Sequence, residues 1–455
     1  MIEPGIYHQA GDRRGTTVGE LDLTASWAGI SAVVVFCVAY ALVISEEFHH
    51  LRKCKPVILA AGLIWAIIGF EYTRTGNQAS LEPAVREYLV EYAELFLFLL
   101  AAMTYVNSMN ERRVFKALRV WLINRGFSLR TLFWATGVLS FFLSALIDNL
   151  TTVLVMSGVV LAVGGNNKRF ISVCSVNIVV AANAGGAFSP FGDITTLMVW
   201  QSGILAFHKF FALFIPSVVN YVVPALFLSI AVKNGAAEKQ AEAVEMRMGA
   251  KRIMMLFVLT VFMAVSFHNY LHLPPFMGMV TGLACLQLFG FYLRRKETEI
   301  AANSHQHMAG DVMPYDTFRE IARAEWDTLL FFFGVIMSVG GLTFLGYLGG
   351  LSQFLYVELG PTVANVLVGV MSAVVDNIPM MVVVLHMNPV MGEDQWLLVT
   401  LAAGVGGSLL SIGSAAGVAM MGQARGSYSF FSHLKWAPVI ALGYGSSIWV
   451  HLLIN

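Results

Sequence analysis

The stretch SALIDNLTTVLVM, at residues 144–156, places Asp148 and Asn149 in the middle of a long apolar segment. A second stretch, SAVVDNIPMMVVV at residues 372–384, repeats its Ser-Ala-x-x-Asp-Asn pattern about half a chain length later. A carboxylate that lies inside an apolar run twice is not explained by chance or by packing alone. The sequence therefore indicates a duplicated unit with an Asp-Asn pair at the centre of each copy.

The composition indicates a protein that crosses a membrane. Hydrophobic residues make up 57% of the chain and charged residues 12%, against about 25% charged residues in soluble domains. Windows such as 27–45 and 210–232 reach the roughly 18 apolar residues that suggest a membrane span. Only helices and closed barrels satisfy every backbone group inside a bilayer. Since these runs do not alternate between apolar and polar residues, the sequence predicts an all-α polytopic membrane protein.

Charge and cysteine usage exclude several other classes. The chain carries 28 basic and 28 acidic residues, and a net charge near zero argues against nucleic acid as a partner. Its four cysteines form no Cys-x-x-Cys pair, so neither a disulfide framework nor a metal knuckle is indicated. No cleavable signal is expected, because 26 mostly polar residues precede an apolar run long enough to stay as an anchor.

The distribution of Lys and Arg predicts the orientation of the spans, because cytoplasmic loops are rich in both residues. Arg52, Lys53 and Lys55 follow the first apolar run, so the N-terminal tail, 1–26, is expected outside. Successive spans then alternate and bring the C-terminus to the same outer side. An amphipathic helix at 111–125 is expected to lie at the interface. The ten predicted spans are 27–45, 57–71, 94–109, 171–200, 210–232, 253–271, 276–293, 327–348, 396–421 and 436–454.

Two further apolar segments are predicted to be re-entrant helical hairpins. The segment 131–167 contains no Lys or Arg but has basic residues beyond both of its ends, which places both ends on one side of the membrane. Its counterpart, 361–392, begins and ends near acidic residues. Non-helical backbone at membrane depth is tolerated only where it is buried in protein or lines a cavity. A water-exposed turn between two ordinary spans is the alternative interpretation of each Asp-Asn pair.

Two of the predicted spans are interrupted by residues that form helices poorly. The first contains AANAGGAFSPFGD at 181–193 and the second contains LAAGVGGSLLSIGSAAG at 401–417, and Gly and Pro disfavour a helix interior. A charged linker at 233–252 separates a first repeat, 27–232, from a second repeat, 253–455, of opposite topology. Inverted repeats with broken helices are typical of secondary transporters, whose binding sites lie where the breaks meet.

The hairpin tips and helix breaks would bring hard oxygen ligands together. Carboxylates, amides and hydroxyls of this kind suit Na⁺ or Li⁺, and the four segments contain no Lys or Arg, so we expect a site for cations and not for anions. A carboxylate can also bind a proton, so Na⁺ and H⁺ would compete for it. The candidate ligands are Asp148, Asn149, Thr151, Thr152, Asn183, Asp193, Thr195, Thr196, Asp376, Asn377, Ser408, Ser411 and Ser414.

The motifs SALIDNLTTV, NAGGAFSPFGDITT, SAVVDNIP and GGSLLSIGSAAG together resemble the NhaD-type sodium/proton antiporters of the ion transporter superfamily, over nearly the whole chain. The resemblance implies a homodimer in the bacterial inner membrane, so the outer side on which both termini are expected is the periplasm; no cofactor is expected. It also implies an elevator-like transport part that exchanges cytoplasmic Na⁺ or Li⁺ for external H⁺, a role in pH homeostasis and salt tolerance. The second tip departs from the first, with Pro379 and Met380 where the first has Thr151 and Thr152.

The residues that the resemblance assigns to transport form two groups. Na⁺ is expected at Asp148, Asn149, Asp376 and Asn377, and the acidic positions at the membrane edge, Glu94 and Asp327, are expected on a proton pathway. The full set of ion-binding and transport residues is Asp148, Asn149, Thr151, Asn183, Asp193, Thr195, Thr196, Ser372, Asp376, Asn377, Ser411 and Ser414.

Other functions remain open on the sequence alone. An anion or arsenite permease of the same superfamily would not need Asp148 or Asp376, and a passive channel would carry ions without moving protons. An intramembrane aspartyl protease would use two aspartates as an acid/base pair, but PFGD at 190–193 lacks the Gly-x-Gly-Asp pattern, and no enzyme is expected. In the structural interpretation of the same residues, Asp193 only caps a helix and the Gly-Gly pairs only allow close packing.

Overall fold

The computed structural model describes residues 23–46, 51–233, 235, 244–303 and 314–455. These residues form helices and no strand, and ten of the helices are long and apolar enough to cross a membrane. The all-α polytopic class is therefore confirmed. Most of the predicted tail, namely 1–22, and part of the predicted linker, namely 234 and 236–243, lie outside the described residues.

The described residues form a series of α-helices and a few short helical turns of other types. The α-helices are α1 (Trp27–Ile44), α3 (Cys54–Thr75), α4 (Leu81–Glu111), α5 (Val114–Asn124), α6 (Leu129–Ile147), α7 (Asn149–Gly164), α8 (Lys168–Gly186), α9 (Ile194–Gln201), α10 (Phe214–Ala231), α11 (Ala250–Leu271), α12 (Pro275–Asn303), α13 (Thr317–Ala322), α14 (Trp326–Phe344), α15 (Tyr347–Ser352), α16 (Pro361–Val375), α17 (Asn377–Met387), α18 (Glu393–Gly406), α19 (Ala415–Gln423), α20 (Phe430–Leu434) and α21 (Ala437–Ile454). Short helical turns of other types are η1 (Gln78–Ser80), η2 (Phe207–Leu213) and η3 (Gln353–Glu358).

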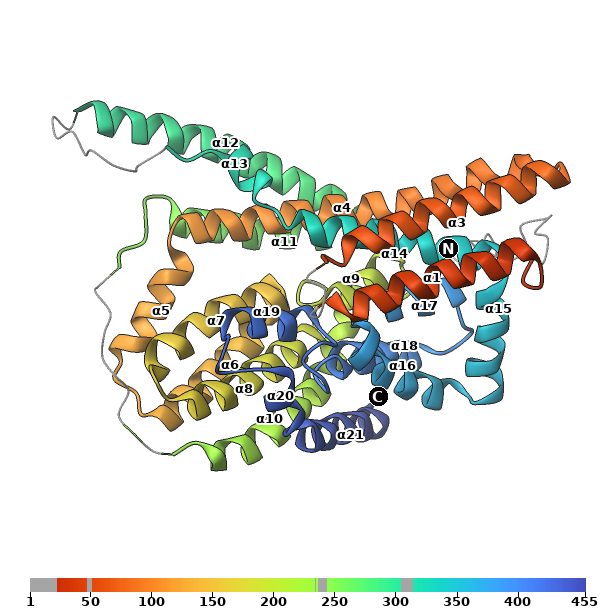
Figure 1. Ribbon diagram of the computed structural model, residues 1–455. Coiled ribbons are helices and arrows are strands. Elements are labelled where there is room, and N and C mark those ends of the chain that lie inside the picture. The colour runs from red at the N-terminus through yellow and green to blue at the C-terminus, as the bar shows by residue number, and fades with distance from the viewer. Residues whose placement is uncertain (1–22, 47–50, 234, 236–243, 304–313) are drawn as a thin grey trace, which may run out of the picture.

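The helices pack into two bodies, which lie one above the other in Figure 1. The upper body consists of α1, α3, α4, α11, α12 and α14, and the lower body of α6–α8, α10, α16, α18, α19 and α21. Helices α5 and α15 run between the bodies at opposite edges of the molecule. Helix α17 packs against α14 of the upper body and against α16 and α18 of the lower body. The contact between the bodies therefore passes beside the second Asp-Asn pair.

Each predicted hairpin consists of two helices that meet at an aspartate. Asp148 joins α6 to α7 with φ 74°, and Asp376 joins α16 to α17 with φ 85°. A positive φ is uncommon for any residue with a side chain, although Asp adopts it more readily than most. In both hairpins a serine hydroxyl donates a hydrogen bond to a backbone carbonyl of the neighbouring broken helix. Ser144 Oγ donates to Ala182 O at 2.6 Å, and Ser372 Oγ donates to Ala403 O at 3.0 Å.

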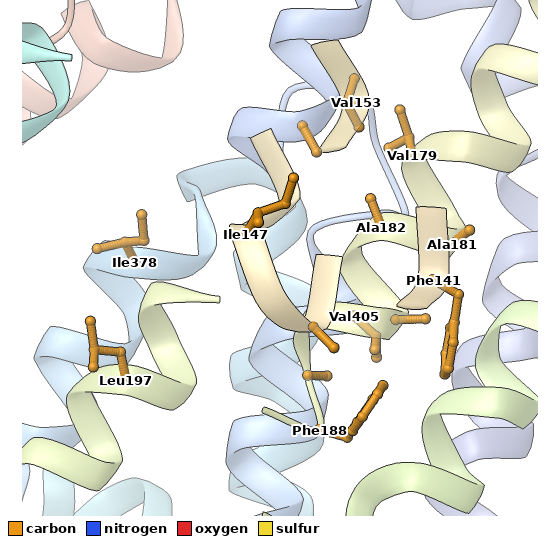
Figure 2. Close-up of a cluster of buried hydrophobic side chains, with 14 of the residues drawn as sticks. Phe141, Ile147, Val153, Val179, Ala181, Ala182, Phe188, Leu197, Ile378 and Val405 are labelled. Carbon is orange, nitrogen blue, oxygen red and sulfur yellow. The ribbon is translucent and has the colours of Figure 1, made fainter. Parts of the chain in front are cut away.

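Both predicted helix breaks are present. The first lies between α8 and α9 and the second between α18 and α19. Each preceding helix has a glycine pressed against a hairpin helix: a Cβ on Gly185 would lie 1.9 Å from Phe141 O, and one on Gly406 would lie 2.0 Å from Gly369 O. Gly185 and Gly406 therefore allow close packing of each broken helix against its hairpin. Around the first tip and break, α6–α9, α17 and α18 pack through buried apolar side chains such as Ile147, Phe188 and Ile378 (Figure 2).

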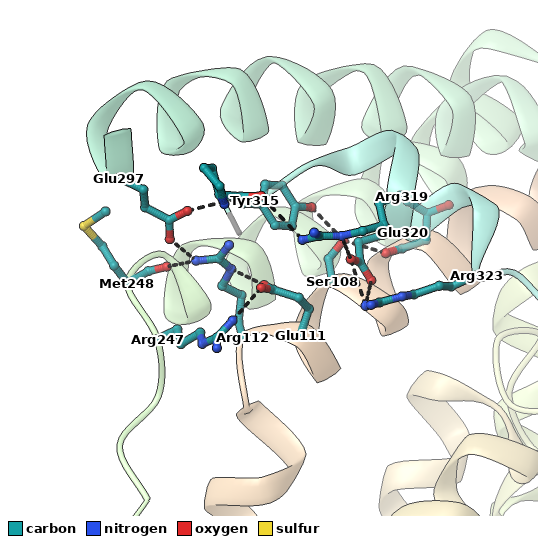
Figure 3. Close-up of polar contacts among 12 residues, drawn as sticks. Ser108, Glu111, Arg112, Arg247, Met248, Glu297, Tyr315, Arg319, Glu320 and Arg323 are labelled. Atoms are coloured by element: carbon teal, nitrogen blue, oxygen red, sulfur yellow. Dashed lines mark hydrogen bonds and ion pairs between the residues drawn. The ribbon is translucent and has the colours of Figure 1, made fainter. Parts of the chain in front are cut away.

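A buried charge cluster joins helices of the upper body (Figure 3). Arg112, which follows α4 and is only 1% exposed, pairs with Glu297 of α12 and lies 4.6 Å from the ring centroid of Tyr315. Arg247, ahead of α11, donates to Glu111 at 2.8 Å. Since an unpaired buried charge is strongly unfavourable, this cluster fixes the end of α4 to α12 and to the segment that precedes α11.

Several predicted boundaries are wrong. Helix α4 begins at Leu81 instead of residue 94, with a polar first section that includes the Glu82–Arg86 ion pair at spacing i,i+4. The stretch between the predicted spans 276–293 and 327–348 contains the end of α12 and all of α13. Polar residues with good helix propensity extend a helix beyond its apolar window, which a hydropathy pattern does not detect. The candidate spans also include α6 and omit the interrupted pair α18 and α19.

Candidate functional site

Asp193 is the centre of a polar network built from both halves of the chain. It precedes α9 as the helix cap, where its Oδ1 accepts from the Thr195 backbone N–H at 3.0 Å and the Thr195 hydroxyl at 3.2 Å. Asn149 Nδ2, from the first tip, donates to Asp193 Oδ2 at 3.1 Å, and Asn377 Nδ2, from the second tip, donates to the same atom at 3.1 Å. Asp193 therefore caps a helix and also joins the two Asp-Asn tips.

Asn183 extends this network to the second helix break. Its Oδ1 accepts from Asn149 Nδ2 at 3.1 Å, while its Nδ2 lies 2.8 Å from Ser408 Oγ and 2.9 Å from Ser414 Oγ. Asn183 is on α8, and the two serines lie within the break between α18 and α19. All three residues are fully buried. The structure thus brings together residues that are more than 200 positions apart in the sequence.

The two tip aspartates have different partners. Asp148 caps α7, because its Oδ1 accepts from the Thr151 backbone N–H at 2.7 Å and its Oδ2 accepts from the Thr151 hydroxyl at 2.9 Å. Asp376 caps nothing, since Pro379 stands at the corresponding position and has no N–H. Instead, Asp376 Oδ2 accepts from Lys53 Nζ at 2.7 Å. No hydrogen bond joins Asp148 to Asp376 in the described part of the chain, so a shared Na⁺ site remains a prediction.

A cavity of about 370 Å³ lies in front of this network. Asp148, Asn149, Asp193 and Asn377 line it together with Asp327, the second residue of α14. Five acidic side chains and two basic ones, Arg52 and Lys53, line the cavity, so its electrostatic potential favours cations. The acidic side chains are Glu46, Asp148, Asp193, Glu325 and Asp327. The four predicted segments themselves contain no Lys or Arg, but Lys53 reaches the cavity from the beginning of α3.

The two predicted proton-pathway residues line different cavities. Asp327 is the second residue of α14 and forms an ion pair with Arg52 in the first cavity. Glu94 lies well inside α4, and not near the helix start, and lines a second cavity of about 690 Å³. Glu91 of that second cavity lies 3.1 Å from His386 Nε2. The role of either residue on a proton pathway stays a prediction.

Three predicted ligands direct their hydroxyls elsewhere. Thr196 Oγ1 donates to the backbone carbonyls of Ser189 and Asp193, at 2.9 and 2.6 Å. Ser372 Oγ also donates to a backbone carbonyl, and Ser411 Oγ lies 3.3 Å from Met421 Sδ. These side chains support the helix breaks and the hairpin packing. Thr152 is fully buried, and its hydroxyl has no hydrogen-bond partner among the described residues.

Sequence reasoning missed two residues at the site, Lys53 and His433. Lys53 was part of a basic cluster that predicted only a cytoplasmic loop. His433, in α20 and outside the candidate spans, places Nε2 2.8 Å from the Ser408 carbonyl and Nδ1 2.7 Å from the Tyr428 hydroxyl. A carbonyl can only accept, so Nε2 carries the proton and Nδ1 of the neutral ring accepts. Burial lowers the pKa of His433 to about 4, which agrees with a neutral ring.

The described residues contain no candidate site for a permanently bound metal ion. No group of three or more His, Cys, Asp and Glu side chains there could hold a metal ion. The site consists instead of single carboxylates linked by amides and hydroxyls. Interrupted helices that meet at such a site, inside a bundle of membrane-length helices, define a secondary membrane transporter.

Comparison with known proteins agrees with this class. A family model described as "Citrate transporter" matches residues 23–406. The Na(+)/H(+) antiporter NhaD of Vibrio cholerae is 57% identical over 96% of this chain and 94% of its own length, and that of Halomonas elongata is 54% identical over 97% and 92%. Sodium/proton antiporter 1 of Arabidopsis thaliana is 30% identical over 96% of this chain and 75% of its own length. The chain belongs to the NhaD family of sodium/proton antiporters, and it is a transporter and not an enzyme.

Proposed function

We propose that this chain exchanges cytoplasmic Na⁺ or Li⁺ for external H⁺ across the bacterial inner membrane. The names of the bacterial relatives support the reaction, and the excess of acidic side chains in the first cavity supports a cation as substrate. The single observation that carries the proposal is Asp193 Oδ2, which accepts from Asn149 and Asn377 at 3.1 Å each and lies beside that cavity.

In this proposal the cation binds between the two tips, where it replaces amide hydrogens as the partner of Asp193. Asp193 already accepts hydrogen bonds from Thr195, Asn149 and Asn377, so its oxygens have no unused capacity. Rotation of either asparagine amide would turn its carbonyl oxygen, a ligand suited to Na⁺, toward the cation. Asp148 and Asp376 add the carboxylates that neutralise the charge as the cation arrives.

Exchange follows from competition at one carboxylate group. A bound cation favours the ionised form of a carboxylate, because its positive charge lies next to the negative one. A bound proton neutralises the carboxylate and removes the charge that holds the cation. The two ions therefore exclude each other. If only the loaded site changes sides, each turnover carries one kind of ion outward and the other inward. The lower body would move as the elevator against the upper body, which would form the homodimer interface. The first cavity would face the cytoplasm, with both termini in the periplasm.

The test uses purified protein in liposomes that contain a trapped pH dye and an acidic interior. Addition of NaCl or LiCl is expected to make the interior more alkaline, while choline chloride at the same ionic strength is expected to have no effect. A response to citrate or arsenite, with none to Na⁺ or Li⁺, would replace the antiporter by an anion permease. Movement of ²²Na⁺ without a change in the dye signal would indicate a passive channel.

A further inference from the structure

One positively charged side chain reaches the candidate site from the other body of the molecule. Lys53 stands at the start of α3, in the upper body, and its Nζ lies 2.7 Å from Asp376 Oδ2 at the junction of α16 and α17. The side chains are 24% and 7% exposed, respectively. Lys53 Nζ also lies 4.7 Å from the ring centroid of Phe331 on α14, where an aromatic face attracts a cation. The upper body therefore holds the ammonium group against the second tip.

The sequence around Asp376 explains why this carboxylate takes a partner from outside its own hairpin. In the first tip, the Thr151 backbone N–H and hydroxyl satisfy both oxygens of Asp148. In the second tip, Pro379 offers neither group. The Oδ1 atom of Asp376 is buried and has no hydrogen-bond partner among the described residues. A buried carboxylate in this state is unfavourable unless a cation accompanies it.

Lys53 stands where a transported cation would neutralise the same carboxylate. It lines the first cavity together with Asn377, and Asn377 donates to Asp193. We propose that Lys53 is a tethered cation that occupies Asp376 whenever no transported cation does so, and that competes with Na⁺ for this carboxylate. This inference rests on the proposed exchange function and adds a residue that determines its apparent Na⁺ affinity and its coupling.

The ion pair also links the two bodies. While Lys53 is bound to Asp376, α3 of the upper body is joined to the second tip, beside α17, and the empty transport part is held in place. A cation that displaces Lys53 breaks this link, and its own charge compensates the Asp376 carboxylate. The lower body, now with the cation bound, is then free to move. Lys53 thereby suppresses movement of the empty carrier, which would otherwise let Na⁺ cross without a counter-ion.

The test compares Lys53→Gln with Lys53→Arg and with Lys55→Gln, which removes an exposed lysine two residues away. In the wild type, Lys53 leaves Asp376 free in only a minor fraction of molecules, and only these bind Na⁺. Removal of Lys53 frees Asp376 in all molecules, so the half-saturating Na⁺ concentration should fall. The decrease is about tenfold if Asp376 is free in one wild-type molecule in ten. Lys53→Gln is also expected to admit ²²Na⁺ without equivalent proton movement. Lys53→Arg and Lys55→Gln are expected to retain the wild-type values.

A second variant at another position and a measurement of Na⁺ binding test the same inference. The variant does not depend on the folding of Lys53→Gln, and the binding measurement does not depend on transport turnover. Pro379→Thr offers Asp376 the backbone N–H and hydroxyl that Thr151 gives Asp148, so it should weaken the Lys53 contact and also lower the half-saturating Na⁺ concentration. In detergent, NaCl should raise the unfolding temperature of Lys53→Gln more than that of the wild type, relative to choline chloride.

Three outcomes overturn the inference. An unchanged half-saturating Na⁺ concentration in Lys53→Gln, with exchange intact, removes Lys53 as a competitor and leaves the antiporter function standing. A lower maximal rate and a lower unfolding temperature, with no change in Na⁺ affinity, assign Lys53 a structural role only. A wild-type protein that shows neither exchange nor stabilisation by Na⁺ refutes the proposed function and this inference together.

Discussion

Asp193 caps a helix and also connects the two Asp-Asn tips. As the cap of α9 it accepts from the backbone and side chain of Thr195, and as the junction of the tips it accepts from Asn149 and Asn377. A carboxylate has about four acceptor positions, so the carboxylate is fully satisfied without any ion. A cation that binds here must displace an amide hydrogen bond, which explains how Na⁺ binding and the relative position of the two tips can be linked.

Replacement of Asp193 by Asn is expected to abolish Na⁺/H⁺ exchange while the protein still folds. Asparagine retains an oxygen that can accept from the Thr195 backbone, so the helix cap survives, but the charge that binds Na⁺ or H⁺ is lost. We expect exchange in liposomes to fall at least about a hundredfold, the equivalent of roughly 3 kcal/mol. Asp394→Asn, at an exposed position in the first turn of α18, is the matched control and should keep the wild-type rate.

His433 predicts a pH dependence of stability. Its pKa is lowered to about 4 by burial, below the value near 6.5 of an exposed histidine. Above pH 6.5 the ring is neutral in both states; as pH falls further, the unfolded chain takes up a proton that the folded protein does not, so stability decreases. This group alone should remove about 2 kcal/mol between pH 7 and pH 5. Unfolding of the purified protein over this range should therefore be less pH-dependent in His433→Gln, and equal slopes for both proteins would contradict the assignment.

At the residue scale, sequence reasoning identified the residues of the centre but not all of their contacts. Asp148, Asn149, Asp193 and Asn377 could be predicted because a polar residue in an apolar run requires a partner or a cavity. Ser372 and Thr196 could not be separated from the ligands, since a hydroxyl that donates to a backbone carbonyl has the same sequence signal. Lys53 was missed because its contact depends on the direction in which α3 leaves the loop, which no local pattern specifies.

At the scale of elements, glycine allows the interrupted helices to approach the hairpin helices. Gly185 and Gly406 hold equivalent positions on α8 and α18, and both face a backbone carbonyl of a hairpin helix at a distance that no side chain fits. The helix breaks themselves were predictable from Gly and Pro. The length of α4 and the existence of α13 were not, because charged residues such as Glu82 form helices as readily as they form loops.

Gly185→Ala and Gly406→Ala are each expected to destabilise the protein by about 1–3 kcal/mol, as overpacking does. The added methyl group would lie within about 2 Å of a carbonyl oxygen in either case, so the hairpin must shift and the tip with it. Exchange in liposomes should therefore decrease together with the unfolding temperature in detergent. Gly62→Ala, in α3, meets nothing within 4 Å and should leave both properties unchanged.

At the scale of the whole molecule, the candidate site lies between two bodies with different kinds of support. The upper body is secured by the charge cluster at Arg112 (Figure 3) and by direct helix packing. The lower body carries the first tip, and α9, which Asp193 caps, packs against α18 of the same body, with buried apolar side chains around them (Figure 2). At the site, the Lys53–Asp376 ion pair joins the upper body to the second tip, so the movement proposed above would have to break this contact.

Arg112→Ala is expected to destabilise the upper body strongly. The change leaves Glu111 and Glu297 with reduced charge compensation in a buried setting, and loss of one partner of a buried pair typically costs about 3–5 kcal/mol. The unfolding temperature in detergent should fall clearly. Arg86→Ala breaks an exposed ion pair on α4 and should change stability by less than about 0.5 kcal/mol. Equal effects of the two substitutions would contradict the structural role assigned to the Arg112 cluster.

The central claim is that Na⁺ and H⁺ compete for one carboxylate site formed by both halves of the chain. The most direct test is the half-saturating Na⁺ concentration for exchange in liposomes, measured at several pH values for the wild-type protein. Competition predicts that this concentration rises as pH falls, with a slope that approaches about tenfold per pH unit at low pH, while the maximal rate at saturating Na⁺ is preserved. A half-saturating concentration that does not change with pH, with only the maximal rate altered, would mean that the two ions bind at different sites.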